Sequence, residues 1–123
     1  MPEPTPTDAD LDLAVLVGTL SSDPVEQTLG SGSTLVRYEV TVRDRSPADT
    51  VPVSWLDPRR VPALASGDRV LVVGRVRRRF FRAGGATRSA TEVAASTVCR
   101  ATASRAASAL ADAAALVDAC RTR

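Results

Sequence analysis

The sequence contains no histidine and no lysine, only two cysteines, and aromatic residues at only 3% of its 123 positions. The absence of histidine removes the commonest general acid or base and the commonest metal ligand. Cys99 and Cys120 lie far apart without metal-binding spacing, and a single pair is too few for a disulfide scaffold. The scattered serines and carboxylates include no nucleophile with a base, no metal cluster and no phosphate-binding loop. We therefore predict that the protein is not an enzyme and uses no metal, no cofactor and no small-molecule substrate.

A long apolar run is also missing, because no stretch approaches the roughly 20 residues that a membrane-spanning helix needs. The first residues are acidic and rich in proline, whereas a secretory signal begins basic and continues apolar. We predict a mobile, disordered tail over residues 1–10, a cytoplasmic location and no membrane contact. The length and the 44% apolar content fit one compact domain, over residues 11–100, followed by a helix over residues 101–123.

Charge is distributed unevenly along the chain, although the formal net charge is only +2. Residues 1–36 contain six acids and no base, which gives −6. Residues 69–105 contain nine arginines and one acid, Glu92, which gives +8. A basic segment in a nearly neutral protein is the pattern expected of a polyanion-binding protein.

Residues 66–82 change character along one predicted strand. A Gly67-Asp68 turn leads into an apolar run, and arginines and two phenylalanines follow. Alternate residues of a strand share a face. One face therefore carries Arg75, Arg77, Arg79 and Phe81, and the opposite face carries Val76, Arg78 and Phe80, with Phe80 expected in the core. Guanidinium groups pair with phosphates and a ring stacks on any base, so the first face suits a single-stranded nucleic acid. The alternative is a solvated face with both rings in the core.

Short runs of alternating or apolar residues, separated by turn residues, predict a mainly β domain. The predicted strands cover residues 11–20, 34–43, 50–56, 69–82 and 87–100, with a further short strand at 25–29. The segment around Gly84-Gly85 predicts a hairpin turn. Asp57-Pro58 predicts the start of a short helix that runs to Leu64-Ala65.

Four single residues have a predicted place in these strands. Gly18 indicates a bulge or a sharp bend, and Pro52 places its strand at an edge or at a bulge. Tyr38 lies on the apolar face of its strand, so we expect it in the core with its hydroxyl near a rim. Trp55, the one tryptophan, either stacks on a base or closes the core.

Residues 101–121 are rich in alanine and predict a helix. Three- and four-residue spacing gives this helix one apolar stripe, formed by Ala103, Ala106, Ala107, Leu110, Ala113, Ala114, Val117 and Cys120. The stripe docks either on the barrel of its own chain, which we prefer, or on the same helix of another subunit.

Four stretches share the order and spacing of residues in a known family. They are Val15-Leu16-Val17-Gly18-Thr19-Leu20-Ser21-Ser22-Asp23-Pro24, Val40-Thr41-Val42-Arg43, Gly67-Asp68-Arg69-Val70-Leu71-Val72-Val73-Gly74-Arg75-Val76 and Thr91-Glu92-Val93. Over roughly residues 11–100 the chain resembles the bacterial single-stranded DNA-binding protein family, as a divergent short member. The resemblance implies a five-stranded OB-fold barrel with a short helix between the third and fourth strands, to which this chain adds the alanine-rich helix.

The resemblance also implies a function. The family is not catalytic and wraps single strands over a basic oligomeric surface, usually a tetramer, with aromatic rings between the bases. By this resemblance Phe81 matches a stacking aromatic, and Trp55 lies within a residue of another. Two further family aromatics are missing, near residues 45–47 and 48–50, and the C-terminal helix replaces the family's acidic tail tip. Because stacking is worth about 1–3 kcal/mol per base, two missing rings lower the affinity by several kcal/mol.

The leading hypothesis is a non-enzymatic protein that binds single-stranded DNA without sequence specificity, in DNA replication and repair, as a homo-oligomer, either a dimer or a tetramer. RNA stays open as a partner. The candidate contact residues are Arg37, Arg43, Trp55, Arg75, Arg77, Arg79, Phe81, Arg82 and Arg88. The alternative is an OB-fold interaction protein that pairs with a full-length relative or another protein and binds DNA weakly or not at all. The missing aromatics and the missing acidic tip favour it.

Overall fold

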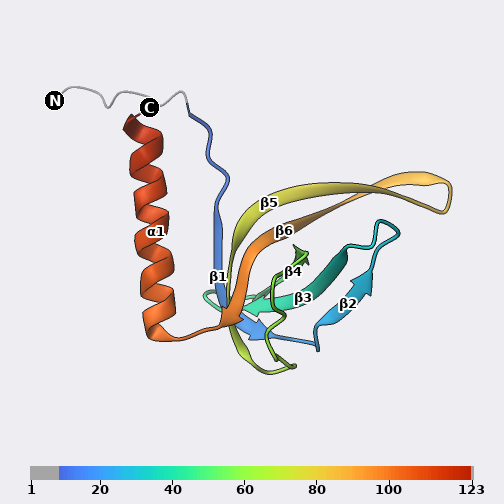
Figure 1. Ribbon diagram of the computed structural model, residues 1–123, viewed down its shortest axis with the longest axis horizontal. Helices are drawn as coiled ribbons and strands as arrows, with labels where there is room; N and C mark the ends of the chain where they lie inside the picture. The colour runs from blue at the N-terminus through green and yellow to red at the C-terminus, as the bar shows by residue number, and fades with distance from the viewer. Residues whose placement is uncertain (1–8, 123) are drawn as a thin grey trace.

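Six β-strands and one α-helix make up the described part of the protein, residues 9–122 of a computed structural model (Figure 1). In chain order they are β1 (Ala14–Leu20), β2 (Val25–Thr28), β3 (Thr34–Val42), β4 (Asp49–Leu56), β5 (Arg69–Ala83), β6 (Ala86–Arg100) and α1 (Ala103–Thr122). The strand order is β1-β5-β6-β4-β3-β2, and a further β1–β3 pairing closes the sheet into a barrel. The tail predicted for residues 1–10 lies mostly outside the described residues. Over residues 9–122, no helix is both long and apolar enough to cross a membrane.

Closure of the barrel depends on a close approach of β1 to β3 at Gly18. β1 pairs with β5 through this glycine without a register shift, and its last two residues also pair with β3. A Cβ atom on Gly18 would lie 2.5 Å from the carbonyl oxygen of Thr41 and 2.9 Å from a methyl carbon of Val40. The glycine that we predicted to mark a bulge or bend is therefore needed because the β3 backbone leaves no room for a side chain. The irregularity in register lies instead between Val73 and Gly74 of β5.

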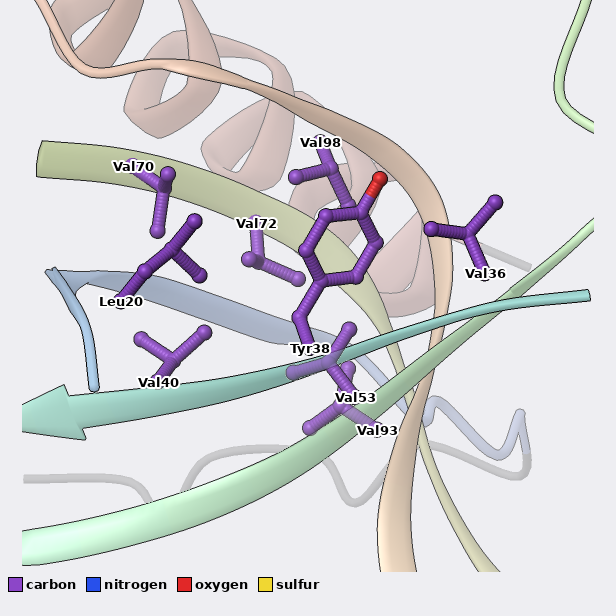
Figure 2. Packing of buried hydrophobic residues seen from close by; sticks show 9 residues of the cluster. All are labelled: Leu20, Val36, Tyr38, Val40, Val53, Val70, Val72, Val93 and Val98. Atoms are coloured by element: carbon purple, nitrogen blue, oxygen red, sulfur yellow. The ribbon is translucent and has the colours of Figure 1, made fainter. Parts of the chain in front are cut away.

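The core is a cluster of mostly β-branched side chains from five strands (Figure 2). Its members are Leu20, Val36, Tyr38, Val40, Val53, Val70, Val72, Val93 and Val98, none more than 4% exposed. Valine dominates because a branched side chain packs well on a pleated surface and has little rotamer freedom to lose there. The alternation predicted for residues 34–43 is confirmed, since Val36, Tyr38 and Val40 all point into this cluster.

Tyr38 lies in the core at 2% exposure, as predicted, but its hydroxyl does not reach a rim. The oxygen is buried and has no hydrogen-bond partner within residues 9–122. Burial raises the pKa of the phenol to about 12, and the negative charge of Glu26 adds to the shift. Because the folded pKa exceeds the unfolded value of about 10, Tyr38 contributes stability that is complete below pH 10 and is lost as the pH rises toward 12.

The short helix predicted between the third and fourth strands is wrong, because residues 57–68 form turns and extended chain. The backbone of Asp57 has a positive φ of 48°. Its carboxylate accepts a hydrogen bond from the Thr34 amide at 2.8 Å, at the end of the β3–β4 ladder, instead of capping a helix. Pro62 would further interrupt a helix there, because proline lacks the N–H donor and its ring clashes with the carbonyl of Pro58, four residues earlier.

Helix α1 lies beside its own barrel (Figure 1). The Thr102 hydroxyl accepts a hydrogen bond from the Arg105 amide at 3.2 Å and caps the helix. The single apolar stripe that we predicted is covered only along one edge. Ala106, Ala109 and Ala113 are half-buried and Cys120 is buried, whereas Leu110 and Val117 are 64% and 43% exposed. The Cys120 thiol donates to the carbonyl oxygen of Asp10 at 3.8 Å, which connects the end of α1 to the segment before β1.

Substitution of Gly18 by alanine tests the closure of the barrel. Gly18→Ala is expected to lower the free energy of unfolding by about 1–3 kcal/mol, because the Thr41 backbone cannot move away without separating β1 from β3. Gly30→Ala is the matched control, since a Cβ atom there would meet nothing within 4 Å. Urea unfolding followed by the fluorescence of Trp55 compares the two variants, and equal midpoints would contradict the argument.

Candidate nucleic-acid interface

β5 and β6 continue beyond the barrel as a two-stranded arm, residues 75–91 (Figure 1). β4 pairs with β6 only through Val53 and Ser54, which lie beside Val93 and Ala94. Pro52 therefore has β3 on one side and no paired strand on the other, in agreement with the prediction that Pro52 lies at a strand edge. From Val76 to Ala83, roughly 23 Å of strand, β5 pairs with β6 alone. At the tip, Gly84 and Gly85 have φ values of 59° and 79°, which a two-residue hairpin turn requires.

The arm concentrates positive charge away from the core. It contains six arginines and no acid, and these arginines are Arg75, Arg77, Arg78, Arg79, Arg82 and Arg88. The valines that precede it in β5, Val70 and Val72, are fully buried. One continuous strand therefore changes from barrel core to charged surface where it leaves the barrel.

The outer face of the arm, turned away from the core side of β5, is formed by Arg75, Arg77, Arg79 and Phe81. These residues alternate along β5 as the sequence predicted. The guanidinium carbon of Arg79 lies 5.2 Å from the centroid of the Phe81 ring, so the two side chains are stacked on this face. Arg88 of β6 lies opposite Phe81 in the register.

Glu92 joins the outer face to the barrel. This glutamate is only 8% exposed, and its Oε1 atom lies 2.8 Å from a terminal nitrogen of Arg77 and 3.4 Å from Nε of Arg79. Arg77 also donates to the hydroxyl of Ser54 on β4 at 3.4 Å. Two of the candidate arginines are thus partly neutralised and hold the root of the arm. The sequence signal for Glu92 was its position as the one acid among residues 69–105.

Arg37 is brought to the same face from β3. It pairs in register with Ser54, and together with Glu39, Pro52, Arg79 and Glu92 it lines a hollow of about 180 Å³. Arg37 and Arg75 are exposed and have no ion-pair partner within the described residues. The structure therefore places these two guanidinium groups, with the partly neutralised Arg77 and Arg79, on one surface.

Three other candidate residues lie elsewhere. Arg43 follows the end of β3, roughly 20 Å of strand from Arg37. Arg82 donates to the carbonyl oxygen of Gly85 at 3.1 Å, at the tip of the arm. Trp55 is half-buried and packs against the core, on the opposite face of β4 from Ser54. Of the two alternatives for Trp55, its core contact is observed.

The inner face of the arm, formed by Val76, Arg78, Phe80 and Arg82, differs from the prediction. Phe80, which we expected in the core, is 67% exposed, and Val76 is 49% exposed. The alternation along β5 was correct, but this side of the strand meets the core only as far as Val72. Beyond that point there is no second layer of the barrel to cover it. The alternation of residues along a strand shows which side chains share a face, but it does not show where the strand leaves the barrel.

Comparison with known proteins identifies the fold. No protein-family model and no curated protein sequence match this chain. The solved structure of the wild-type single-stranded DNA-binding protein from Thermus aquaticus is similar, with a TM-score of 0.61 and 26% identity over 75% of this chain and 41% of that one. A deletion and point mutant of the same protein gives a TM-score of 0.63 and 26% identity over 75% and 42%.

This chain therefore spans less than half the length of the proteins that it resembles. Its fold is a mainly β OB-fold barrel with one added C-terminal helix, which confirms the predicted fold class apart from the short helix.

Substitution of Glu92 tests its role at the root of the arm. Glu92→Gln is expected to lower the free energy of unfolding by about 1–2 kcal/mol, because it removes the charged partner of Arg77 and Arg79 while both remain partly in water. Glu39→Gln is the control, since it removes an exposed acid from the same hollow that has no ion pair within residues 9–122. Thermal unfolding compares the two variants, and an equal loss in both would show that net charge rather than the buried contact decides.

Proposed function

We propose that this protein binds single-stranded DNA without sequence specificity and without catalysis. The observation that carries the proposal is the arginine-rich arm on an OB-fold barrel, at whose root Glu92 is ion-paired with Arg77 and Arg79. The similarity to a single-stranded DNA-binding protein at 26% identity supports it. A role in DNA replication and repair and a cytoplasmic location belong to the same proposal.

Phosphate contacts supply most of the binding energy in this proposal. Arg37, Arg75 and Arg88 offer guanidinium groups without an ion-pair partner in the described chain. Arg77, Arg79 and Arg82 keep donors that their internal contacts leave unused. Arg43, just beyond the end of β3, is a separate candidate contact. Contacts to the phosphate backbone carry no sequence information, which is why binding through them does not depend on sequence.

Aromatic stacking is limited on the outer face. The Arg79 guanidinium lies over the Phe81 ring, and Trp55 faces the core. This shortage of open rings is the observation that favours the second candidate function, an OB-fold protein that assembles with a full-length relative or another protein. Native mass spectrometry of a mixture with such a relative separates the two, because detection of homo-oligomers alone would count against the assembly function.

The dependence of DNA binding on salt tests the leading proposal. If only the four arginines of the outer surface, Arg37, Arg75, Arg77 and Arg79, contact phosphates, the slope of log K against log salt is about −3. An increase from about 50 to about 200 mM salt then weakens binding about 50-fold, and further contacts make the slope steeper. Titration of labelled oligo-dT measures the slope. Absence of binding at micromolar protein in low salt would refute the proposal, and competition by oligo-U decides whether RNA is also bound.

The matched variants for this titration are Arg75→Gln and Arg100→Gln. Loss of one phosphate contact makes the slope less steep by about 0.7. We expect this change for Arg75→Gln and not for Arg100→Gln. Arg100 lies at the barrel end of the β5–β6 pair, opposite Val70, and pairs with Asp68 at 3.4 Å. An equal effect of both variants would show that binding follows total charge and not the arm.

A homo-oligomer, either a dimer or a tetramer, is part of the proposed function. β1 pairs with β3 only at its last two residues, so Ala14–Gly18 has β5 on one side and no strand of the described chain on the other. Charged residues and proline usually protect an edge strand from pairing with another chain, and this edge has neither. It therefore suits pairing with a second copy.

Light scattering tests the assembly, since the monomer mass is 12.9 kDa. We expect two or four times that mass without DNA, and the same protein mass plus that of the oligonucleotide in the complex. Val17→Lys, which places a charge on the 37% exposed residue of this edge, is expected to return the protein to a monomer. Val25→Lys is the control, because it replaces a more exposed valine on β2, a strand that already carries Glu26. A monomeric wild-type protein would refute this part of the proposal.

A further inference from the structure

Phe80 is the most exposed large apolar side chain in the described structure, with 67% of its surface open to solvent. Single exposed apolar residues are ordinary on protein surfaces. Phe80 differs because it is a full ring on a strand whose neighbours on the same face are charged. Its surroundings decide what such a ring can bind.

The neighbours of Phe80 on the inner face are all basic, apolar or hydroxylic. Arg78 and Arg82 precede and follow it on the same side of β5. Across the ladder, Ser89 lies opposite Phe80, with Thr91 and Thr87 opposite the two arginines. Arg78 is exposed and has no ion-pair partner in the described chain. The face thus presents cation, ring and cation in sequence along one strand, with hydroxyl groups beside them and no acid.

The adjacent ring, Phe81, is less available. It is half-buried, and the Arg79 guanidinium lies 5.2 Å from its centroid. Its face also contains the acid of the arm root, Glu92, which is bonded to Arg77 and Arg79. No such cation is found over Phe80 among residues 9–122. Two consecutive phenylalanines therefore project to opposite faces, and only the inner one is open.

We infer that the inner face of the arm is a second contact surface for single-stranded nucleic acid, with a base stacked on Phe80 and phosphates on Arg78 and Arg82. The inference rests on the proposed function and deepens it. An aromatic ring accepts any base, and flanking guanidinium groups hold the phosphates on either side of a stacked base. Another protein surface is a poorer occupant, because burying the ring would also desolvate two arginines that have no acid on this face. The nucleic acid thus contacts the arm on both faces, and the arm inserts into the bound strand instead of lying beneath it.

The matched pair Phe80→Ala and Phe81→Ala tests the inference, since the two residues are adjacent and face opposite ways. With labelled oligo-dT at low salt, Phe80→Ala is expected to raise Kd about 5- to 150-fold, the loss of one stacked base. Phe81→Ala is expected to have the smaller effect. Because Phe80 is not part of the core, the Phe80→Ala variant should unfold at the same temperature as the wild type.

A second measurement reports stacking directly. Trp55→Phe combined with Phe80→Trp leaves one tryptophan, on the inner face, and its fluorescence is expected to be quenched as oligo-dT binds. A wild-type protein that binds oligo-dT, with a Phe80→Ala variant of unchanged Kd and an unquenched reporter, would overturn the inference and leave the proposed function standing. A wild-type protein that fails to bind removes both. A fall in the mass of the DNA-free protein on Phe80→Ala, without a change in Kd, would identify the ring as a contact between copies and also overturn the inference.

Discussion

The pairing of β5 with β6 is the interaction on which the barrel and the arm both depend. The two strands pair from Val70–Arg100 to Ala83–Ala86, whereas their neighbours β1 and β4 are about half as long. The ladder therefore has to extend beyond the barrel. Its first half is stabilised by burial of valines. Its second half has ladder hydrogen bonds and a few surface side-chain contacts but no buried apolar cluster, and an isolated two-stranded hairpin is marginal in water. The contacts of Glu92 with Arg77, and of Arg77 with Ser54, fasten the arm at the boundary between the two halves.

Local periodicity was enough to predict much of this structure. The alternation of β3, the two faces of β5 and the Gly84-Gly85 turn follow from the geometry of single strands and hairpins. The position of Phe80 could not be derived in the same way. Its exposure depends on where β5 separates from β1 and where β6 separates from β4, which is set by pairing between distant segments. Glu92, by contrast, lies opposite Arg77 in the register that a two-residue turn at Gly84-Gly85 sets. The contact of Arg77 with Ser54 could not be derived in this way, because it depends on the pairing of β4 with β6.

The error at residues 57–68 has a different origin. Asp57 and Pro58 form a common helix start, and local propensity therefore favoured a helix. The Asp57 carboxylate instead accepts the amide hydrogen bond of Thr34, a residue of β3. The Asp57 carboxylate is thus occupied by a tertiary hydrogen bond and does not cap a helix. Pro62 also lacks the N–H that would donate to the carbonyl of Pro58 in a helix. Propensity was outweighed by a partner that lies 23 residues away in sequence.

In the proposed function, helix α1 limits how a bound strand can run along the outer face. Its Leu116 lines a hollow of about 450 Å³ together with Arg75 and Arg77, and further down the ladder α1 lies across another hollow from Leu71 and Cys99. The outer basic face is therefore bounded by the helix at one end and open at the arm tip at the other. The inner face has no such boundary until the strand reaches the core at Val72. In the proposed function, a nucleic acid that follows the arginines from Arg75 toward the tip meets the turn at Gly84 and Gly85, where both faces are accessible. In the proposed function, a nucleic acid that crosses from the outer face to the inner face at this turn therefore has more contacts available than one that stays on the outer face.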